Sequence, residues 1–405
     1  MIPQNFTELA VFTGRPAFAE PKHVGRPNIG DRARLRERLD DLLDRRWLTN
    51  DGPYVQELER RIAAWTGTQH CVAVTSATVG LLLLCRALGL SGEVIVPSFT
   101  FVGTAGVLEW AGIIPVFCDI DPRTHNIDPY AAERLIGPRT SGIVGVHVWG
   151  RACDVEALQS LTAAAKIRLL FDAAHAFGCT TAGRPIGQFG AAEVFSFHAT
   201  KYVNSFEGGA ITTNDAGLAE SLRLMRNFGF SDYDHTEELG LNGKMSEPAA
   251  AMGLTSLDAE PHFRAINERN YHAFGQALSG LPGITFVQYD PGERNNYQYV
   301  VMEVDETLAG LTRDELHAVL WAEQVRARRY FHPGCHMLEP FKTRYPQYAG
   351  ALPATERLTG RVICLPNGES VSRDDVEVIA SVIRTALRDA EAVRGVLSQR
   401  EVLRA

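Results

Sequence analysis

The chain has 405 residues, of which 45% are hydrophobic and 22% are charged. This length exceeds the usual limit of one hydrophobic core, so we expect two subdomains in a protein of ordinary globular composition. The net charge of -8 argues against a general nucleic-acid binder, although it permits a local basic pocket for a diphosphate.

The cysteines and the apolar runs indicate a compartment. Seven cysteines are scattered at positions 71, 85, 118, 153, 179, 335 and 364, without a disulfide framework. This usage is typical of a reducing environment, and we expect the cytoplasm. Residues 1–12 lack the features of a signal peptide, and the longest apolar run, residues 79–84, is too short to span a bilayer. We therefore expect no membrane partner.

The first third of the chain begins without periodicity. Residues 1–30 contain four prolines and are predicted to form an extended arm. Leucines at helical spacing predict a helix over 31–46, turn residues interrupt it at 47–53, and a second helix follows over 55–65.

From residue 71 to residue 213, short β runs alternate with segments of helical length. This alternation predicts a mostly parallel sheet flanked by helices, in a large domain over 31–257. Such sheets bind ligands at the carboxyl ends of their strands. The predicted strands are residues 71–74, 93–96, 113–117, 142–146, 168–171, 194–197 and 210–213.

Beyond residue 257 the pattern changes to that of a smaller α+β domain, over 258–405. Strands are predicted at 284–287, 299–304 and 325–331. Helices are predicted at 313–324 and 374–387.

The segment around Lys201 is the first candidate site. An apolar run ends at Ser196 and Phe197, one lysine follows, and Gly208 and Gly209 allow a close backbone approach. A lysine beside a buried strand end tends to lose its charge and become a nucleophilic amine. The alternative is a surface lysine with a buried stem.

Three other strand ends carry matching chemistry. Asp172 follows an apolar run, and a carboxylate there could hold the ring nitrogen of pyridoxal 5'-phosphate protonated. Ser76, Ala77 and Thr78 open a helical segment whose free N–H groups could bind a phosphate. Phe101 could stack on a flat ring. Taken singly, these residues are also typical of helix caps and of a hydrophobic core.

Residues 330–336 contain Tyr330, His332, Cys335 and His336. Two histidines and a cysteine are possible zinc ligands, but a structural site needs four ligands and no second pair lies nearby. We therefore favour a loop that faces substrate and predict no metal, while each histidine could also be a core residue.

Taken in order, these motifs resemble the DegT/DnrJ/EryC1/StrS aminotransferases. The resemblance rests on TSATVG, PSFTF, DAAHA, SFHATK with EGG behind it, and GLNGKMSE, and it runs from about Pro27 to the 380s. It implies the fold of type I pyridoxal-phosphate (PLP) transferases. It also implies a nucleotide-linked keto sugar as substrate and a homodimer with a shared active site.

The resemblance assigns roles to individual residues. It implies Lys201 as the Schiff-base lysine, Asp172 as the partner of the pyridine nitrogen, Phe101 as the stacking aromatic and His175 as the contact of the ring hydroxyl. Ser76, Ala77 and Ser196 would bind the phosphate, with Asn242 reaching it from the neighbouring subunit. Tyr330, His332 and His336 become substrate candidates, as does Lys244, which stands where an arginine is common.

The implied reaction is a ping-pong transamination with L-glutamate as donor and pyridoxamine 5'-phosphate between the half-reactions. The motifs look more like the sugar C4 branch, which acts on dTDP-4-keto-6-deoxyglucose in antibiotic deoxysugar pathways, than the C3 branch. A PLP-dependent sugar dehydratase carries histidine in place of the lysine, so Lys201 argues against it. A non-catalytic regulator would have lost the amine or the acid, and both are present.

Overall fold

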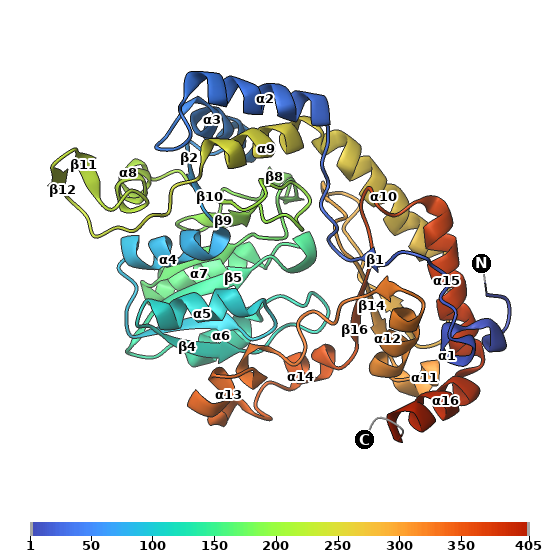
Figure 1. The fold of residues 1–405 in the computed structure, drawn as a ribbon. Helices are drawn as coiled ribbons and strands as arrows, with labels where there is room; N and C mark the ends of the chain where they lie inside the picture. The colour runs from blue at the N-terminus through green and yellow to red at the C-terminus, as the bar shows by residue number, and fades with distance from the viewer. Residues whose placement is uncertain (1–2, 403–405) are drawn as a thin grey trace.

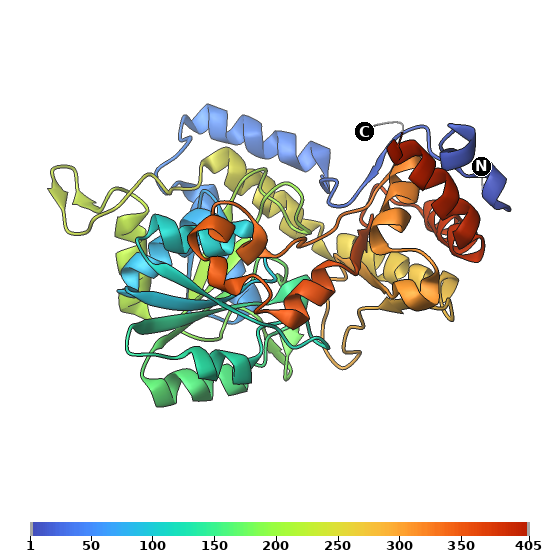
Figure 2. The same ribbon diagram turned by 90° about the horizontal axis from the view of Figure 1, so that it is seen from below.

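The computed structural model of the protein describes residues 3–402. It has a larger part, built on a seven-stranded sheet with helices on both faces, and a smaller part beside it (Figure 1). The first and the last described segments, near residues 3 and 402, both lie on the smaller part (Figures 1 and 2). Within the described residues, no helix combines the length and the apolar character needed to cross a membrane.

The large sheet confirms the expected fold class. Antiparallel β10 lies between β2 and β9, and all other neighbours pair in parallel. Each predicted strand matches an observed one to within two residues at either end. In spatial order the strands are β2 (His70–Val74), β10 (Gly209–Thr213), β9 (Glu193–Ser196), β6 (Arg168–Asp172), β5 (Thr140–Val146), β3 (Glu93–Pro97) and β4 (Ile114–Cys118).

Alternating side chains divide the interior of the larger part into two cores, because successive residues of a strand point to opposite faces. Val194 packs in one core and Phe195 in the other. The first face is covered by α4 (Ala77–Ala87), α5 (Val102–Trp110) and α8 (Ala216–Met225). The second is covered by α3 (Pro53–Thr66), α6 (Pro129–Leu135), α7 (Val155–Ala165) and α9 (Glu247–Asp258). Outside α9 lies α2 (Arg32–Arg45).

The smaller part has its own core between a three-stranded antiparallel sheet and a layer of helices. The strands are β13 (Ile284–Phe286), β14 (Val300–Val304) and β16 (Val362–Leu365). The helices are α10 (Glu260–Ala277), α11 (Glu306–Ala309), α12 (Arg313–Ala322), α15 (Arg373–Arg388) and α16 (Ala390–Val402). In Figure 1, α9 and α10 lead the chain from the larger part to the smaller one.

Two sequence predictions are wrong in detail. The predicted strand over 325–331 is a strand only at β15 (Val325–Arg326), which pairs with β1 (Lys22–His23). Beyond it, Phe331 packs its ring against Phe99 and Trp149 instead of continuing a ladder. The predicted extended arm, whose residues 1–2 lie outside the described part, contains η1 (Phe6–Glu8) and α1 (Ala10–Thr13), because Leu9 and Val11 are buried in the core of the smaller part.

One late segment returns to the larger part. It contains η3 (Cys335–Met337), α13 (Phe341–Arg344), η4 (Pro346–Tyr348) and α14 (Pro353–Thr359). Cys335, Phe341 and Leu352 are buried in the same core as α4 and α5. Just before this segment, Phe331 packs against Phe99, two residues beyond the carboxyl end of β3 in the large sheet.

Candidate active site

Lys201 follows strand β9, and its side chain lines a cavity of about 390 Å³ whose walls come from both parts of the molecule. Its amine donates to the Tyr299 hydroxyl over 3.4 Å. Burial lowers the pKa of Lys201 to about 8, although the nearby Asp172 carboxylate opposes the shift. Near neutral pH a useful fraction of this amine is therefore uncharged and nucleophilic.

Asp172 ends strand β6 and lines the same cavity with only 6% of its surface exposed. The Thr104 hydroxyl donates to Oδ2 over 2.7 Å, and the Ala174 backbone N–H donates to Oδ1 over 3.0 Å. Burial raises the pKa of Asp172, while these two hydrogen bonds and Lys201 oppose the increase. Each oxygen keeps a lone pair, so this desolvated carboxylate can accept a hydrogen bond from a protonated ring nitrogen.

The residues that the sequence predicts to bind phosphate come together through strand β10. Gly209 pairs with Val74 on one side and with Ser196 on the other, which brings Ser196 beside the start of α4. A Cβ on Gly209 would lie 2.6 Å from the Ala77 nitrogen, so only glycine permits this approach. Ser76 is the N-cap of α4, and its hydroxyl accepts the Val79 N–H over 3.2 Å, which leaves the Ala77 and Thr78 N–H groups of the first turn without a partner in the helix. N–H groups in this position can bind an anion, and we call this site the phosphate cradle.

Phe101 and His175 also line the cavity. Phe101 is the N-cap residue of α5 and is 59% exposed, whereas Phe99, two residues earlier, is fully buried. The exposed ring is therefore free to stack on a ligand. His175 accepts the Trp149 backbone N–H at Nδ1 over 3.3 Å, and burial holds its pKa well below the usual value. It is a neutral imidazole with its proton on Nε2, which makes it a donor there.

Eight of the candidate residues thus line one cavity: Ser76, Ala77, Phe101, Asp172, His175, Ser196, Lys201 and Tyr330. Asn242 and Lys244 do not line it. Asn242 is exposed, and the Lys244 amine lies 4.7 Å from the Phe228 ring centre.

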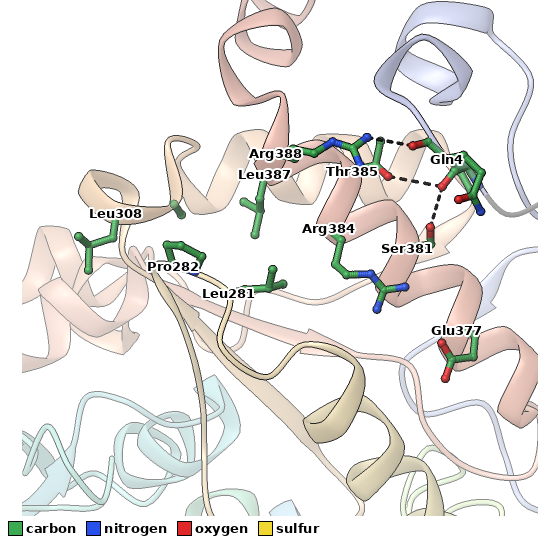
Figure 3. Close-up of a pocket in the computed structure, with 12 residues that line it drawn as sticks. Gln4, Leu281, Pro282, Leu308, Glu377, Ser381, Arg384, Thr385, Leu387 and Arg388 are labelled. Atoms are coloured by element: carbon green, nitrogen blue, oxygen red, sulfur yellow. Dashed lines mark hydrogen bonds between the residues drawn. The ribbon is translucent and has the colours of Figure 1, made fainter.

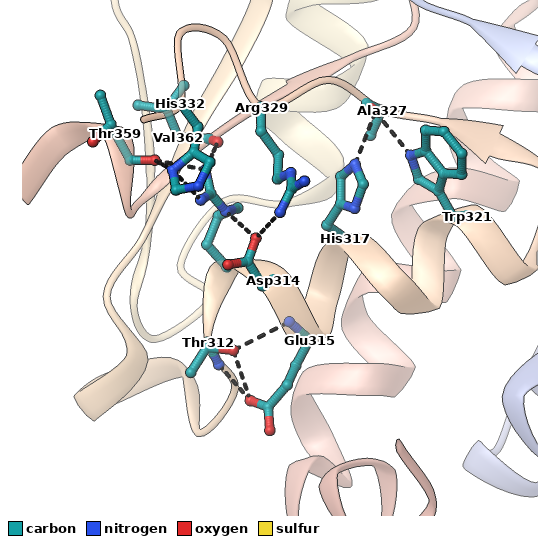
Figure 4. A network of polar contacts seen from close by, with 11 residues as sticks. Thr312, Asp314, Glu315, His317, Trp321, Ala327, Arg329, His332, Thr359 and Val362 are labelled. Carbon is teal, nitrogen blue, oxygen red and sulfur yellow. Dashed lines mark hydrogen bonds and ion pairs between the residues drawn. The ribbon is translucent and has the colours of Figure 1, made fainter. Parts of the chain in front are cut away.

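Neither His332 nor His336 lines the cavity around Lys201. His332 lines a neighbouring cavity of about 500 Å³ instead. Its Nδ1 is 3.3 Å from the Arg313 guanidinium and 3.3 Å from the Thr359 carbonyl (Figure 4). His336 is buried, with Nδ1 at 2.6 Å from the Ser98 hydroxyl and Nε2 at 3.3 Å from Glu356. It is a core histidine that ties the late segment to the strand end before Phe101.

Sequence reasoning missed three residues of the site. Thr104 holds Asp172, Tyr299 contacts Lys201, and Arg328 contributes a guanidinium to the cavity wall. Tyr299 and Arg328 belong to the smaller part, and no local motif marks either of them. Thr104 lies three residues after Phe101, one helical turn into α5. Its place on the helix face that packs on the sheet was the only signal in the sequence for a role in the site.

A cavity of about 680 Å³ lies between the N-terminal segment and α15 (Figure 3). It is larger than the cavity around Lys201, but its side chains offer less chemistry. Arg384 and Arg388 donate to the backbone carbonyls of Ala277 and Gln4. Among the described residues that line it there is no lysine, histidine or cysteine. Side-chain chemistry, not volume, therefore selects the cavity around Lys201.

A phosphorylated pyridine aldehyde fits these residues. The cradle at Ser76 and Ser196 would hold its phosphate, Asp172 would hold the ring nitrogen, Phe101 would cover a ring face, and the Lys201 amine would meet the aldehyde carbon. Cavity size also agrees, because ligand sites commonly measure about 300–1,000 Å³. The fold and this set of cavity residues define a PLP-dependent aminotransferase of fold type I.

Comparison with known proteins places the chain more closely. Residues 30–384 match the model of the DegT/DnrJ/EryC1/StrS aminotransferase family, and the chain belongs to this family. It is 34% identical over 365 residues to dTDP-4-amino-4,6-dideoxy-D-glucose transaminase from Shigella dysenteriae, covering 90% of this chain and 99% of the relative. The Escherichia coli enzyme of the same name is 31% identical over 366 residues, covering 89% and 97%.

Among solved structures, the chain is similar to DesI, crystallised in the presence of its TDP-sugar product. The two share 49% sequence identity with a TM-score of 0.91, over 96% of this chain and 98% of DesI. PseC from Helicobacter pylori, an aminotransferase of pseudoaminic acid biosynthesis, shares 26% identity with a TM-score of 0.84, over 90% and 99%.

Proposed function

We propose that this protein transfers an amino group from L-glutamate to dTDP-4-keto-6-deoxy-D-glucose, giving dTDP-4-amino-4,6-dideoxy-D-glucose. The observation that carries the proposal is the meeting of Lys201 and Asp172 in one buried cavity, beside an anion cradle. The relatives from Shigella and Escherichia and the TDP-sugar complex of DesI support the choice of sugar.

The roles of the side chains follow from their environments. PLP, when bound, supplies a cationic ring that withdraws electrons from the carbon bearing the transferred nitrogen. Asp172 would keep the ring nitrogen protonated, because a buried carboxylate favours a positive partner. Lys201 Nζ would serve as attachment point and then as base, since an amine of pKa about 8 can take up and return a proton near neutral pH. One base would serve both half-reactions.

The choice of carbon is tested with two substrates. We expect the purified protein, loaded with PLP and supplied with L-glutamate, to convert dTDP-4-keto-6-deoxy-D-glucose at least about tenfold faster than the 3-keto isomer, an effect of about 1.4 kcal/mol. Product mass and nuclear magnetic resonance spectra identify the aminated carbon. Turnover of only the 3-keto compound would establish the runner-up, a C3 aminotransferase.

A homodimer with a shared site is a second part of the proposal. The hairpin of β11 (Phe230–Asp232) and β12 (His235–Thr236) projects from the larger part (Figures 1 and 2). It exposes Phe230 and Tyr233, and Asn242 follows it. Exposed aromatic side chains are typical of interfaces. A segment that leaves its own body can reach the cavity of a second copy.

Mixed subunits test this arrangement. We expect Asn242→Ala alone to weaken cofactor binding about tenfold, through loss of a hydrogen bond to phosphate. Dimers co-expressed from Lys201→Ala and Asn242→Ala chains contain one site with both residues intact. At limiting cofactor they should therefore exceed the summed activity of the two parent variants. A monomer by sedimentation, or mixed dimers without this gain, would exclude the shared site.

A cytoplasmic location and a place in an antibiotic deoxysugar pathway complete the proposal. All seven cysteines are unpaired and buried, which supports a reducing compartment. Fractionation of the producing cells tests the first point, and loss of the amino sugar from the cell's products after gene disruption tests the second.

A further inference from the structure

Arg328 has the position of a substrate anchor. It is the only arginine among the described residues that line the cavity around Lys201. It also lines a neighbouring cavity of about 500 Å³, together with Thr100, Phe101, Tyr330 and Phe331, which the two cavities share. Arg328 therefore lies where the two cavities meet.

The Arg328 guanidinium contacts Tyr330 but has no carboxylate partner among the described side chains. Its backbone exchanges hydrogen bonds with Cys364 of β16, which fixes the base of the side chain. The guanidinium lies 5.1 Å from the Tyr330 ring centre, and among the side chains of residues 3–399 no carboxylate forms an ion pair with it. By contrast, the next residue, Arg329, pairs with Asp314 over 2.7 Å (Figure 4).

This position is distinct from the phosphate cradle. Ser76, Ala77 and Ser196 line the first cavity only, whereas Arg328 lines both. The cradle offers backbone N–H groups and hydroxyls, and Arg328 offers a planar cation. A guanidinium binds carboxylate or phosphate through two parallel hydrogen bonds, and a partly apolar surrounding strengthens that attraction.

Both substrates of the proposed reaction are anions. An acidic amino donor carries carboxylates, and a nucleotide sugar carries a diphosphate, each at a distance from the reacting atoms. We propose that Arg328 is the oxyanion anchor of the substrate site and binds a carboxylate of the donor, the diphosphate of the sugar nucleotide, or each in turn. This inference rests on the proposed function and deepens it.

The test separates the two anions. The glutamate arm measures KM for L-glutamate in the first half-reaction, followed by the spectral change of the holoenzyme. The nucleotide arm measures dTDP binding to the protein by calorimetry and needs no turnover. We expect Arg328→Gln to weaken at least one arm about 10- to 100-fold, with kcat changed less than threefold. Arg328→Lys, which keeps the charge but loses the fork, should fall between wild type and Arg328→Gln.

Arg326→Gln is the matched control, because Arg326 lies two residues away, donates to Gln324 and lines neither cavity. It should match wild type in both arms. A defect in the glutamate arm alone assigns Arg328 to the carboxylate, and one in the dTDP arm alone assigns it to the diphosphate. Unchanged constants in both arms, for either Arg328 variant with a wild-type melting temperature, overturn the proposal. If wild type fails on keto sugars while Arg328→Gln still loses dTDP affinity, the proposed function is wrong and the anchor stands.

Discussion

Replacing Lys201 with alanine is expected to remove turnover, by at least about 10⁴-fold, while PLP still binds. The expected loss is this large because Lys201 would supply both the amine that holds the cofactor and the base that moves the proton. The Ser76 cradle, the Asp172 carboxylate and the Phe101 ring remain in place to bind PLP. Activity with L-glutamate and the keto sugar, measured beside cofactor content after gel filtration, gives both quantities.

Lys342→Ala is a suitable control for this experiment, because Lys342 is an exposed lysine on α13. It should retain wild-type activity and cofactor content. Wild-type rates in the Lys201 variant would show that another group carries the chemistry. If the Lys201→Ala variant retained no PLP, the Lys201 amine would contribute more to cofactor binding than the other cavity residues do.

Replacing Asp172 with asparagine is expected to lower kcat by on the order of 10²–10³-fold, the range typical of removing one preorganised electrostatic contact. The amide has nearly the same shape and still offers one oxygen to Thr104 or Ala174. It carries no negative charge to keep the ring nitrogen protonated, so the electron-withdrawing ring is weakened. Single-turnover rates with L-glutamate measure the chemical step directly.

Which kinetic constants change is as informative as the size of the change. We expect kcat and kcat/KM to fall together, because the carboxylate acts after binding. Asp215→Asn provides a control, since Asp215 is the N-cap of α8 and asparagine caps equally well. If Asp172→Asn raised only the KM for glutamate, the carboxylate would contribute to substrate binding and not to the cofactor ring.

The parts of the account that sequence predicted share a physical cause. Strands of a parallel sheet place their carboxyl ends at one edge, so Ser76, Phe101, Asp172 and Ser196, each at or just after a strand end, were expected to meet. The glycines after Lys201 were expected to allow a close approach. The structure identifies the neighbour of Gly209 as the start of α4.

What sequence did not predict depends on contacts between distant segments. Arg328 and Tyr299 reach the cavity because the smaller part packs across the sheet edge, and no local pattern encodes that packing. His336 is of a residue type that often binds metals or substrates, but it is buried against Ser98, which is 238 residues away in the sequence. Leu9 and Val11 are buried in a core that contains the C-terminal helices. Because that contact is distant in sequence, the short apolar run after Pro3 was predicted to be part of an extended arm.

The most direct test is to find where the cofactor is attached. The protein incubated with PLP is reduced with borohydride, digested and analysed by mass spectrometry, with the Lys201→Ala variant as control. A pyridoxyl group on the peptide containing Lys201, and on no peptide of the variant, is the result that this account predicts. Attachment at another lysine, or none in a protein that is active, would contradict it.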